Sequence, residues 1–490
     1  MDAADLEALC CEAESTKGPR RSCPTKPLKS AGASLGPRHF FDCLEWQQLI
    51  CFRRTFQSAH KCGHRQDIRW FLMCLPPINE TPSNAIFTWL RRMGKQKRRQ
   101  RHVAAMILFL LTILTLYSLL HLYIFYKIKA TFAFGIVTSV LLILVMALMV
   151  GAPVLVHLSE RYGLEALARH ISYVGYTWMG LAFLFFFTSL TVDIYRLFLH
   201  GGSSLLRWEP SRLNPSPLVA FLVPLLATAI VALYGFFEAR SIRTETVTIE
   251  SNKISQEIGV MTIAQISDVH LGLIVREKRL RGILGEVERA KPDILVSTGD
   301  LVDGQIDNLT GLAELLQDIT PRYGKFAVTG NHEFFAGLDQ ALSFTERAGF
   351  RVLRGESETV AGTVTIAGID DPTAKYFGLG RGVSETDLLS ALPGDAFILL
   401  LKHVPVPNEN PHGLFDLQLS GHTHNGQIFP FNLFTRLVFP YCAGLFQLPH
   451  NSYLYVSRGS GTWGPPIRFL SPPEVTIIKL VHDNAVEISL

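Results

Sequence analysis

Long apolar stretches dominate the first half of the chain. They cover residues 103–125, 132–156, 171–187 (extended toward 199) and 218–237. Each is close to the length of about 20 residues that an α-helix needs to cross a bilayer. Glycine and proline inside these runs are compatible with spanning helices, because membrane helices tolerate both residues. The pattern therefore predicts a multi-pass α-helical membrane region at 103–237.

A different pattern follows the last of these stretches. Short apolar runs rich in β-branched residues occur at 260–266, 294–296, 325–328, 397–401 and 417–419. Such runs are typical of strands that are buried on both faces of a sheet. Amphipathic segments at 276–289, 309–318 and 336–348 are predicted as helices between them. We therefore expect an α/β domain at 244–490, entered through a polar connector at 244–258.

Composition and charge add a membrane topology. Hydrophobic residues make up 48% of the chain and charged residues 18%, which is too apolar for a soluble protein of this size. A dense basic block at 91–101 directly precedes the first apolar run. Basic residues beside a first spanning helix favour the cytosolic side, and four spans return the chain to that side. We therefore expect a cytosolic catalytic domain, and we prefer this topological role of the basic block to nucleic-acid binding, so no nucleic-acid partner is expected.

The segment 1–102 has a composition of its own. It holds seven of the eight cysteines of the chain, and their spacing matches no zinc finger well. No secretory signal is recognised in this segment, so we expect these cysteines to be reduced thiols rather than a disulfide framework. The segment is predicted to be an irregular cytosolic N-terminal region without an assigned function.

Polar residues follow each of the five predicted strands. Because loops at strand ends gather functional side chains at one edge of a sheet, we expect these residues to meet. In chain order they are Asp268 and His270, Asp300, Asn331 and His332, His403, and His422 and His424.

The residue types indicate a metal centre. Asp300 can bridge two cations, because a carboxylate has two oxygens and Gly299 lets the backbone come close. Asp268 and His270 are two residues apart on an extended chain, so they point the same way. Carboxylate, amide and imidazole ligands without thiolate favour two divalent cations of the Mn, Fe, Zn or Co class. His332 adjoins a ligand and is the candidate that protonates the leaving oxygen.

These motifs resemble those of a known family. In order they are D-x-H, G-D, G-N-H-E, H and G-H-x-H, and they span about residues 262–426. This set resembles the calcineurin-like metallophosphoesterases. The resemblance implies a four-layered α/β/β/α sandwich with a dinuclear centre. It also implies two ligand sets, Asp268, His270, Asp300 and His424 for one metal, and Asp300, Asn331, His403 and His422 for the other.

The function that follows is a membrane-bound dinuclear-metal hydrolase that cleaves a phosphoester or phosphoanhydride bond. Its expected partners are the lipid bilayer and a phosphate-containing substrate. The short linker after 237 and an aromatic, loop-like stretch at 429–439 suggest a lipid or lipid-linked substrate, with a soluble substrate near the membrane as the alternative. A transporter, and a metal-binding domain that serves as an interaction or regulatory module, are the competing classes.

Overall fold

The computed structural model describes residues 108, 110–206, 213–304, 309, 311–406 and 413–483. Contacts divide the chain into residues 1–92 and 93–490, and every described residue belongs to the second unit. The predicted irregular segment 1–102 and its basic block therefore lie outside the described residues.

Four described helices are long and apolar enough to cross a membrane. They are Leu110–Phe132, α5 (Ile136–Arg161), α6 (Glu165–Leu206) and α7 (Pro217–Glu238). Large apolar side chains along them are exposed, as expected for surfaces that face lipid. The prediction of four apolar helices is confirmed. The third helix, α6, is longer than its apolar run because a polar turn extends it at each end.

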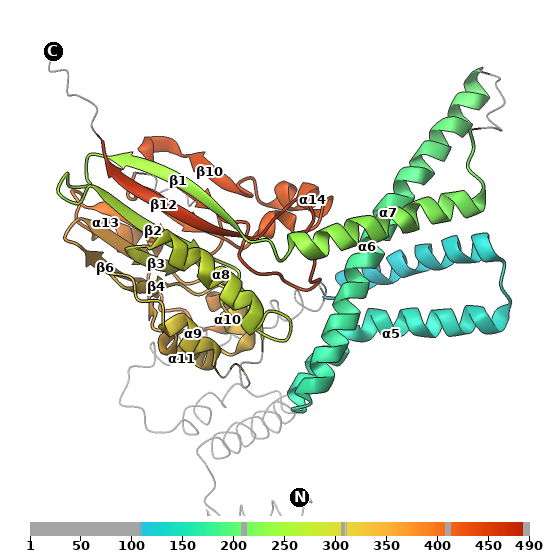
Figure 1. The fold of residues 1–490 in the computed structure, drawn as a ribbon, viewed down its shortest axis with the longest axis horizontal. Helices are drawn as coiled ribbons and strands as arrows, with labels where there is room; N and C mark the ends of the chain where they lie inside the picture. Colours follow the sequence, from blue (N-terminus) through green and yellow to red (C-terminus); the bar gives the residue numbers. More distant parts are fainter. Residues whose placement is uncertain are drawn as a thin grey trace, which may run out of the picture. The chain divides into compact units, whose positions relative to one another are not determined.

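The second half of the chain builds two six-stranded sheets (Figure 1). In spatial order the first sheet contains β1 (Arg243–Ser251), β12 (Glu474–His482), β2 (Val260–Ile266), β3 (Ile294–Ser297), β4 (Lys325–Ala327) and β5 (Arg351–Val352). The second contains β10 (Gly444–Gln447), β11 (Tyr453–Val456), β9 (Leu417–Ser420), β8 (Phe397–Leu401), β7 (Val364–Gly368) and β6 (Glu356–Val360). Both sheets are mixed, since parallel neighbours in each are joined to antiparallel ones.

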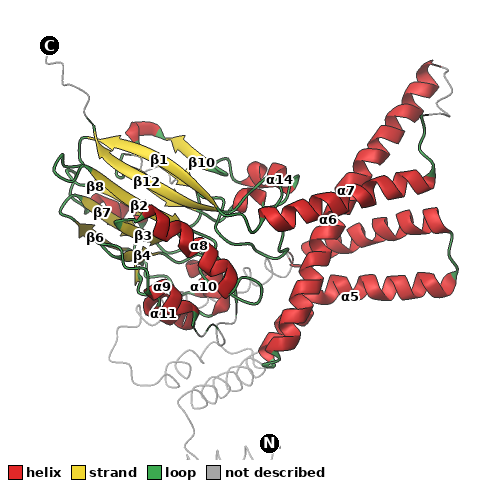
Figure 2. Ribbon diagram, in the orientation of Figure 1, coloured by secondary structure: helices red, strands yellow, loops and turns green. Residues whose placement is uncertain are grey.

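The two sheets face each other across a core that both supply, with Ile263 and Val296 from the first sheet and Leu399 and Leu419 from the second. Helices α8 (Glu277–Ala290), α9 (Leu312–Gln317) and α11 (Leu338–Arg347) cover the outer face of the first sheet over a second core (Figure 2). On the far side, Leu389 of α13 (Glu385–Ser390) packs against the second sheet. The predicted four-layered α/β/β/α sandwich is confirmed.

Short helices complete the domain. These are α10 (Asn331–Ala336), α12 (Thr373–Phe377), α14 (Phe431–Val438) and the 3-10 turns His424–Gly426 and Pro449–Asn451. The five predicted strands are all present, with ends that agree within one residue. The predicted helix at 336–348 divides at Gly337, whose φ of 102° interrupts the helical backbone between α10 and α11.

Two predictions about local structure are wrong. The stretch 244–258 is not merely a polar connector, because residues 243–251 form β1 and pair in parallel with β12. The strand lies at an edge of the sheet, and most of its side chains are polar and exposed. The alternation of apolar and polar residues that would have identified a strand is therefore weak. The stretch 429–439 is not loop-like either, because α14 fills the eight residues between Pro430 and Phe439.

Candidate metal centre

The predicted site residues all stand directly after strands. Asp268 and His270 follow β2, Asp300 follows β3, and Asn331 opens α10 after β4. These three strands are parallel neighbours in the first sheet, so their loops leave the same edge. His403 follows β8, while His422 and His424 follow β9, and these two strands are parallel neighbours in the second sheet. The centre therefore lies where the corresponding ends of both sheets meet.

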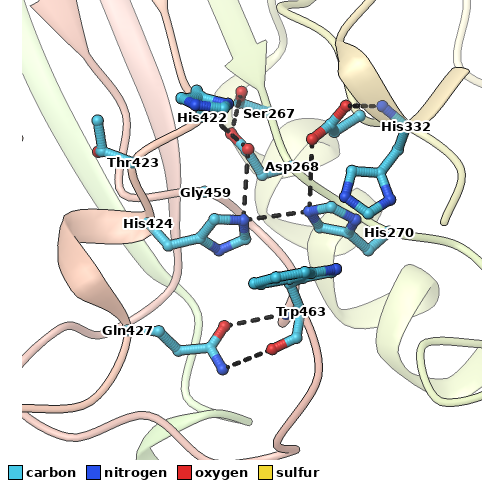
Figure 3. Close-up of polar contacts among 12 residues, drawn as sticks. Ser267, Asp268, His270, His332, His422, Thr423, His424, Gln427, Gly459 and Trp463 are labelled. Carbon is cyan, nitrogen blue, oxygen red and sulfur yellow. Dashed lines mark hydrogen bonds and ion pairs between the residues drawn. The ribbon is translucent and has the colours of Figure 1, made fainter. Parts of the chain in front are cut away.

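One group of donor atoms forms around His424. Its Nε2 lies 3.1 Å from His270 Nε2 and 3.4 Å from Asp268 Oδ1. Figure 3 shows the Asp268, His270 and His424 side chains turned toward one another. Their donor atoms all lie within 4.8 Å, which is close enough for a single cation to bind all three.

A second group forms around His422. Its Nδ1 lies 3.1 Å from Asn331 Oδ1 and 3.2 Å from His403 Nε2. Asp300 joins the two groups, because its Oδ2 lies 3.2 Å from His403 Nε2 and 3.8 Å from His270 Nε2. The structure thus brings together all seven residues predicted as ligands, with Asp300 at the position that a bridging carboxylate needs.

The backbone is strained at this centre. Five of the seven residues have left-handed φ angles between 47° and 72°, namely Asp268, His270, Asp300, His422 and His424. Residues other than glycine rarely adopt this backbone conformation, and strain of this kind concentrates at functional sites. Close packing adds to it, since a Cβ at Gly330 would lie 2.2 Å from Asp300 Oδ1, and one at Gly421 would lie 2.2 Å from Asp268 Oδ2. Only glycine fits at these two positions.

Neighbouring oxygens decide which imidazole nitrogens are free. His403 Nδ1 donates to the Thr298 carbonyl at 2.8 Å, so Nε2 is the nitrogen that faces Asp300 and His422. Burial would lower the pKa of His403, but Asp300 raises this pKa well above its usual value, so a cation that binds at Nε2 replaces a proton there. His270 Nδ1 lies 3.2 Å from Asp303 Oδ1, which favours a free Nε2 in the same way. Hydrogen bonds of this kind orient metal-binding histidines in proteins. Lone pairs of buried nitrogens and carboxylates that face one another at these distances fit a divalent cation.

The pKa shifts of the proposed ligands also fit a cation site. Burial lowers the pKa of His422, and its neighbour His403 lowers it further. Burial followed by His270 holds the pKa of His424 well below its usual value, so both imidazoles are neutral ligands at neutral pH. Burial opposes ionisation of Asp300, but His403 and His332 outweigh it and keep the Asp300 pKa well below the ordinary range. The bridging position is therefore an anion.

His332 stands beside the donor groups. Its backbone N–H donates to Asp300 Oδ1 at 2.8 Å, and its Nδ1 lies 2.9 Å from Asp303 Oδ1. Burial alone would lower its pKa, but Asp300 and Asp303 raise the pKa of His332 to about 9. The imidazole is thus held as a cation that can give up a proton.

Three supporting residues were missed in the sequence. Asp303 contacts both His270 and His332. Glu333 is buried and accepts backbone hydrogen bonds from Gly330 at 2.6 Å and from Leu301 at 2.8 Å. Arg468 is fully buried, and its Nη2 lies 3.1 Å from His424 Nδ1. Glu333 belongs to the Asn-His-Glu motif and could have been identified there, whereas no spacing links Asp303 or Arg468 to the ligands.

Aromatic rings surround the centre. Phe335 and Trp463 pack edge-on against His332, with ring centroids 5.6 and 5.8 Å away, and both rings are more than half exposed. Gln427 fixes Trp463, because its side-chain amide exchanges two hydrogen bonds of 2.9 Å with the Trp463 backbone (Figure 3). Phe439 packs against His422 at 5.1 Å. We call Phe335, Phe439 and Trp463 the aromatic rim.

Comparisons with known proteins agree with this geometry. The model of the family described as "Calcineurin-like phosphoesterase" matches residues 261–426. An "Uncharacterized metallophosphoesterase" of Aquifex aeolicus is 43% identical over 255 residues, which are 51% of this chain and 96% of that protein. A "Transmembrane protein with metallophosphoesterase domain" of Danio rerio is 31% identical over 273 residues, which are 53% of this chain and 62% of that protein.

A solved structure is also similar, at a low level. The 5'-nucleotidase precursor of Thermus thermophilus has 17% sequence identity and a TM-score of 0.29 over 45% of this chain and 54% of that chain. The protein from Aquifex aeolicus is matched over nearly its whole length at 43% identity, which shows that the second half of this chain belongs to the same family.

Proposed function

This chain belongs to the calcineurin-like metallophosphoesterase family, and we propose that it is a membrane-bound hydrolase that cleaves a phosphoester or phosphoanhydride bond with two divalent cations. Membership of the family makes it a metal-dependent phosphoesterase. The observation that carries the two-cation proposal is the position of Asp300 Oδ2, which lies 3.8 Å from His270 Nε2 and 3.2 Å from His403 Nε2. One carboxylate oxygen within reach of two imidazole groups is the arrangement that paired cations require.

The proposed ligands form two sets that share Asp300. The absence of thiolate among them supports cations of the Mn, Fe, Zn or Co class. When bound, two such cations would activate a water molecule and stabilise the charge that develops on the phosphoryl group. The first set is Asp268, His270, Asp300 and His424, and the second is Asp300, Asn331, His403 and His422.

The remaining polar groups hold protons and orient ligands. We assign His332 as the acid that gives a proton to the leaving oxygen, since Asp303 Oδ1 lies 2.9 Å from its Nδ1 and favours the protonated ring. Asp300 Oδ1 accepts the His332 backbone N–H, so the acid and the bridging carboxylate are fixed to each other. Asp303 also orients His270, which couples the acid to the first ligand set.

For the substrate we propose a phosphate compound with a large apolar part, such as a phospholipid or a lipid-linked diphosphate. The aromatic rim supports this proposal, because three apolar rings border a centre that otherwise consists of charged and polar groups. Phe431 and Phe434 of α14 do not belong to the rim, since they pack against Phe183 and Phe187 of α6 at 6.0 and 6.2 Å. The part of the 429–439 stretch that reaches the ligands is Phe439.

The membrane part of the proposal rests on the four apolar helices and on the relative named as a transmembrane protein. We propose that all four span the bilayer, with 103–237 as the membrane region, 244–490 as the catalytic domain and 1–102 as a separate N-terminal segment. The basic block at 91–101 supports a cytosolic location for the N-terminal side and, after four spans, for the catalytic domain.

The experiment measures turnover of the full chain in lipid nanodiscs on two substrates, a phospholipid and a water-soluble aryl phosphodiester. Replacing Trp463 and Phe335 by Ser should lower kcat/KM for the lipid by roughly tenfold or more and leave the soluble ester nearly unchanged. Leu445→Ser, at an exposed position of β10, is the matched control. A rim variant that keeps its lipid preference would exclude a lipid substrate at the rim.

The same assay separates the competing classes. A metal-binding interaction module would bind cations without turnover of either ester. A transporter would need a polar path through the helices, yet Asp193, an acidic residue of α6, is already paired with Tyr123 at 2.5 Å and with Lys127. The structure favours the enzyme over both alternatives.

A further inference from the structure

Helix α8 runs alongside the segment that joins the last apolar helix to β1. Thr244 Oγ1 donates to Glu286 Oε2 at 2.9 Å, and a Cβ at Gly282 would lie 3.3 Å from Ile242 Cδ1. Glu286 and Gly282 are four residues apart, so they lie on one face of α8. Arg279 is three residues before Gly282 on that face. Continuing the same register, Arg279 lies opposite the chain near Arg240.

Arg279 is a cation that forms no ion pair with any residue that the structure describes. Its Nε and Nη2 atoms are buried, and neither has a hydrogen-bond partner among the residues that the structure describes. Burial, and then the positive charge of Arg240, lower the pKa of Arg279 to about 10. Tyr173 of α6 has the opposite effect and raises the pKa of Arg279. It borders the same region, since its hydroxyl donates to the Ile274 carbonyl at 3.2 Å.

Two carboxylates of this region are paired with other arginines. Glu165 pairs with Arg276 at 2.9 Å, and Glu277 pairs with Arg281 at 2.9 Å. Arg240 is exposed and is held in place, because its guanidinium lies 3.3 Å above the Phe236 ring and its Nη1 donates to the Phe236 carbonyl at 2.7 Å. Arg279 therefore has two positive neighbours, Arg240 and the fully buried Arg468, and no carboxylate of the described residues forms an ion pair with Arg279 or Arg240.

A buried cation without a partner is costly, and a second cation beside it raises the cost. A bound anion would remove both penalties, and the planar guanidinium group suits the oxygens of a phosphate. The place also fits a lipid, because Arg240 follows the end of α7 at Glu238 by two residues, where an apolar span reaches the headgroup layer. Leu233 and Phe237, both exposed by 62%, offer apolar surface on the last two turns of α7.

We propose that Arg279 and Arg240 form a binding site for a phosphate group, supplied by an anionic phospholipid that lies beside the end of α7. The site is separate from the seven metal ligands, and it does not depend on the proposed catalytic activity. Nε and Nη2 of Arg279 are closed off from solvent in the structure, so the Arg279 side chain turns toward exposed Arg240 when its N–H groups take the phosphate oxygens. Free inorganic phosphate offers the same oxygens, so the two sources have to be distinguished by experiment.

The test measures lipid binding to the full chain by native mass spectrometry from detergent micelles. Phosphatidylglycerol, phosphatidylcholine and inorganic phosphate are added in separate titrations. The full chain should retain one phosphatidylglycerol more tightly than phosphatidylcholine, and Arg279→Gln should weaken that binding by about tenfold or more, since a charged hydrogen-bond partner is lost. Arg281→Gln, an exposed position on the same helix, should bind like the unchanged chain.

Each result decides the proposal. Equal retention of the two lipids, or a preference for phosphatidylglycerol that survives Arg279→Gln, would overturn it. Saturable binding of inorganic phosphate that Arg279→Gln removes would keep the phosphate site and assign free phosphate as its source. If Arg279→Gln does not fold, Arg240→Gln at the exposed position should weaken the same binding, and an unchanged affinity there would overturn the proposal. The readout is binding, so a failure of the proposed hydrolase activity would leave it unaffected.

Discussion

The backbone N–H of Arg468 donates a hydrogen bond of 3.0 Å to the carbonyl oxygen of Gly235 in α7. The guanidinium of the same Arg468 lies 3.1 Å from Nδ1 of His424, a proposed metal ligand. One buried residue therefore joins an apolar helix to the metal centre. A displacement of α7 would move His424, and small displacements of positioned groups have large effects on rate.

Gly235 is the position at which this link can be disturbed. A Cβ at Gly235 would lie 2.7 Å from the Arg468 carbonyl oxygen, so Gly235→Ala forces α7 and Arg468 apart. We expect kcat to fall by roughly tenfold, because His424 moves with Arg468. Gly151→Ala in α5 is the control, since a Cβ there meets nothing within 4 Å. Equal activity of the two variants would show that the link carries no catalytic effect.

Asp303 should set the pH range of the acid. Asp300 and Asp303 raise the pKa of His332 to about 9 against the effect of burial, so the protonated ring persists to that pH and is lost above it. The stabilisation from this charge is complete below the ordinary histidine pKa of about 6.5 and disappears as pH rises through about 9. Asp303→Asn removes one anion and should move the alkaline limb of kcat to lower pH by about one unit.

Asp339→Asn, at an exposed position of α11, controls for the general effect of losing a carboxylate. The measurement is the pH profile of kcat and of kcat/KM on a soluble phosphodiester. An alkaline limb that stays in place in Asp303→Asn would remove His332 from the role of acid.

The seven proposed ligands could be found in the sequence because each follows a buried strand. The extended-chain spacing assumed for Asp268 and His270 is not what brings them together, since both have left-handed φ angles, of 49° and 54°. Parallel strands then bring the loops together without any further information. The five central strands were predictable for the same reason, since burial on both faces makes their sequences continuously apolar.

Other parts depend on contacts that the local pattern does not contain. Strand β1 lies at the edge of the sheet, and β12 is its neighbour there. The residues of β12 that pair with β1 are more than 200 positions away in the sequence, so no local pattern reveals the pairing. Arg468 and Trp463 reach the centre from the loop between β11 and β12, which lacks any motif of its own. Helix α14 was hidden because it has only eight residues, between Pro430 and Phe439, which is too short for a helical period to stand out in the sequence.

Glu333 should be needed for the shape of the centre. Its Oε2 accepts the backbone N–H of Gly330 at 2.6 Å and of Asp300 at 3.1 Å, while Oε1 accepts that of Leu301 at 2.8 Å. Glu333→Gln places an NH₂ group against backbone donors, which should cost about 1–3 kcal/mol of stability. For a domain of this size the loss corresponds to a Tm decrease of about 2–10 °C.

The comparison variant is Glu288→Gln, at an exposed position of α8, whose Tm should stay within about 1–2 °C of the unchanged chain. Thermal unfolding is followed in one detergent at one metal concentration, because bound metal also stabilises the fold. A Tm of Glu333→Gln equal to that of Glu288→Gln would mean that the buried carboxylate does not hold the loops after β3 and β4 together.

In the proposed centre, Asp300 bridges two catalytic cations. The most direct measurement is the metal content of the purified full chain by inductively coupled plasma mass spectrometry, taken together with turnover of an aryl phosphodiester. We expect about two equivalents of divalent transition metal in the unchanged chain, and in Asp300→Asn fewer than two with at least a thousandfold lower kcat. Two equivalents with full activity in Asp300→Asn, or turnover that survives complete removal of metal by a chelator, would contradict it.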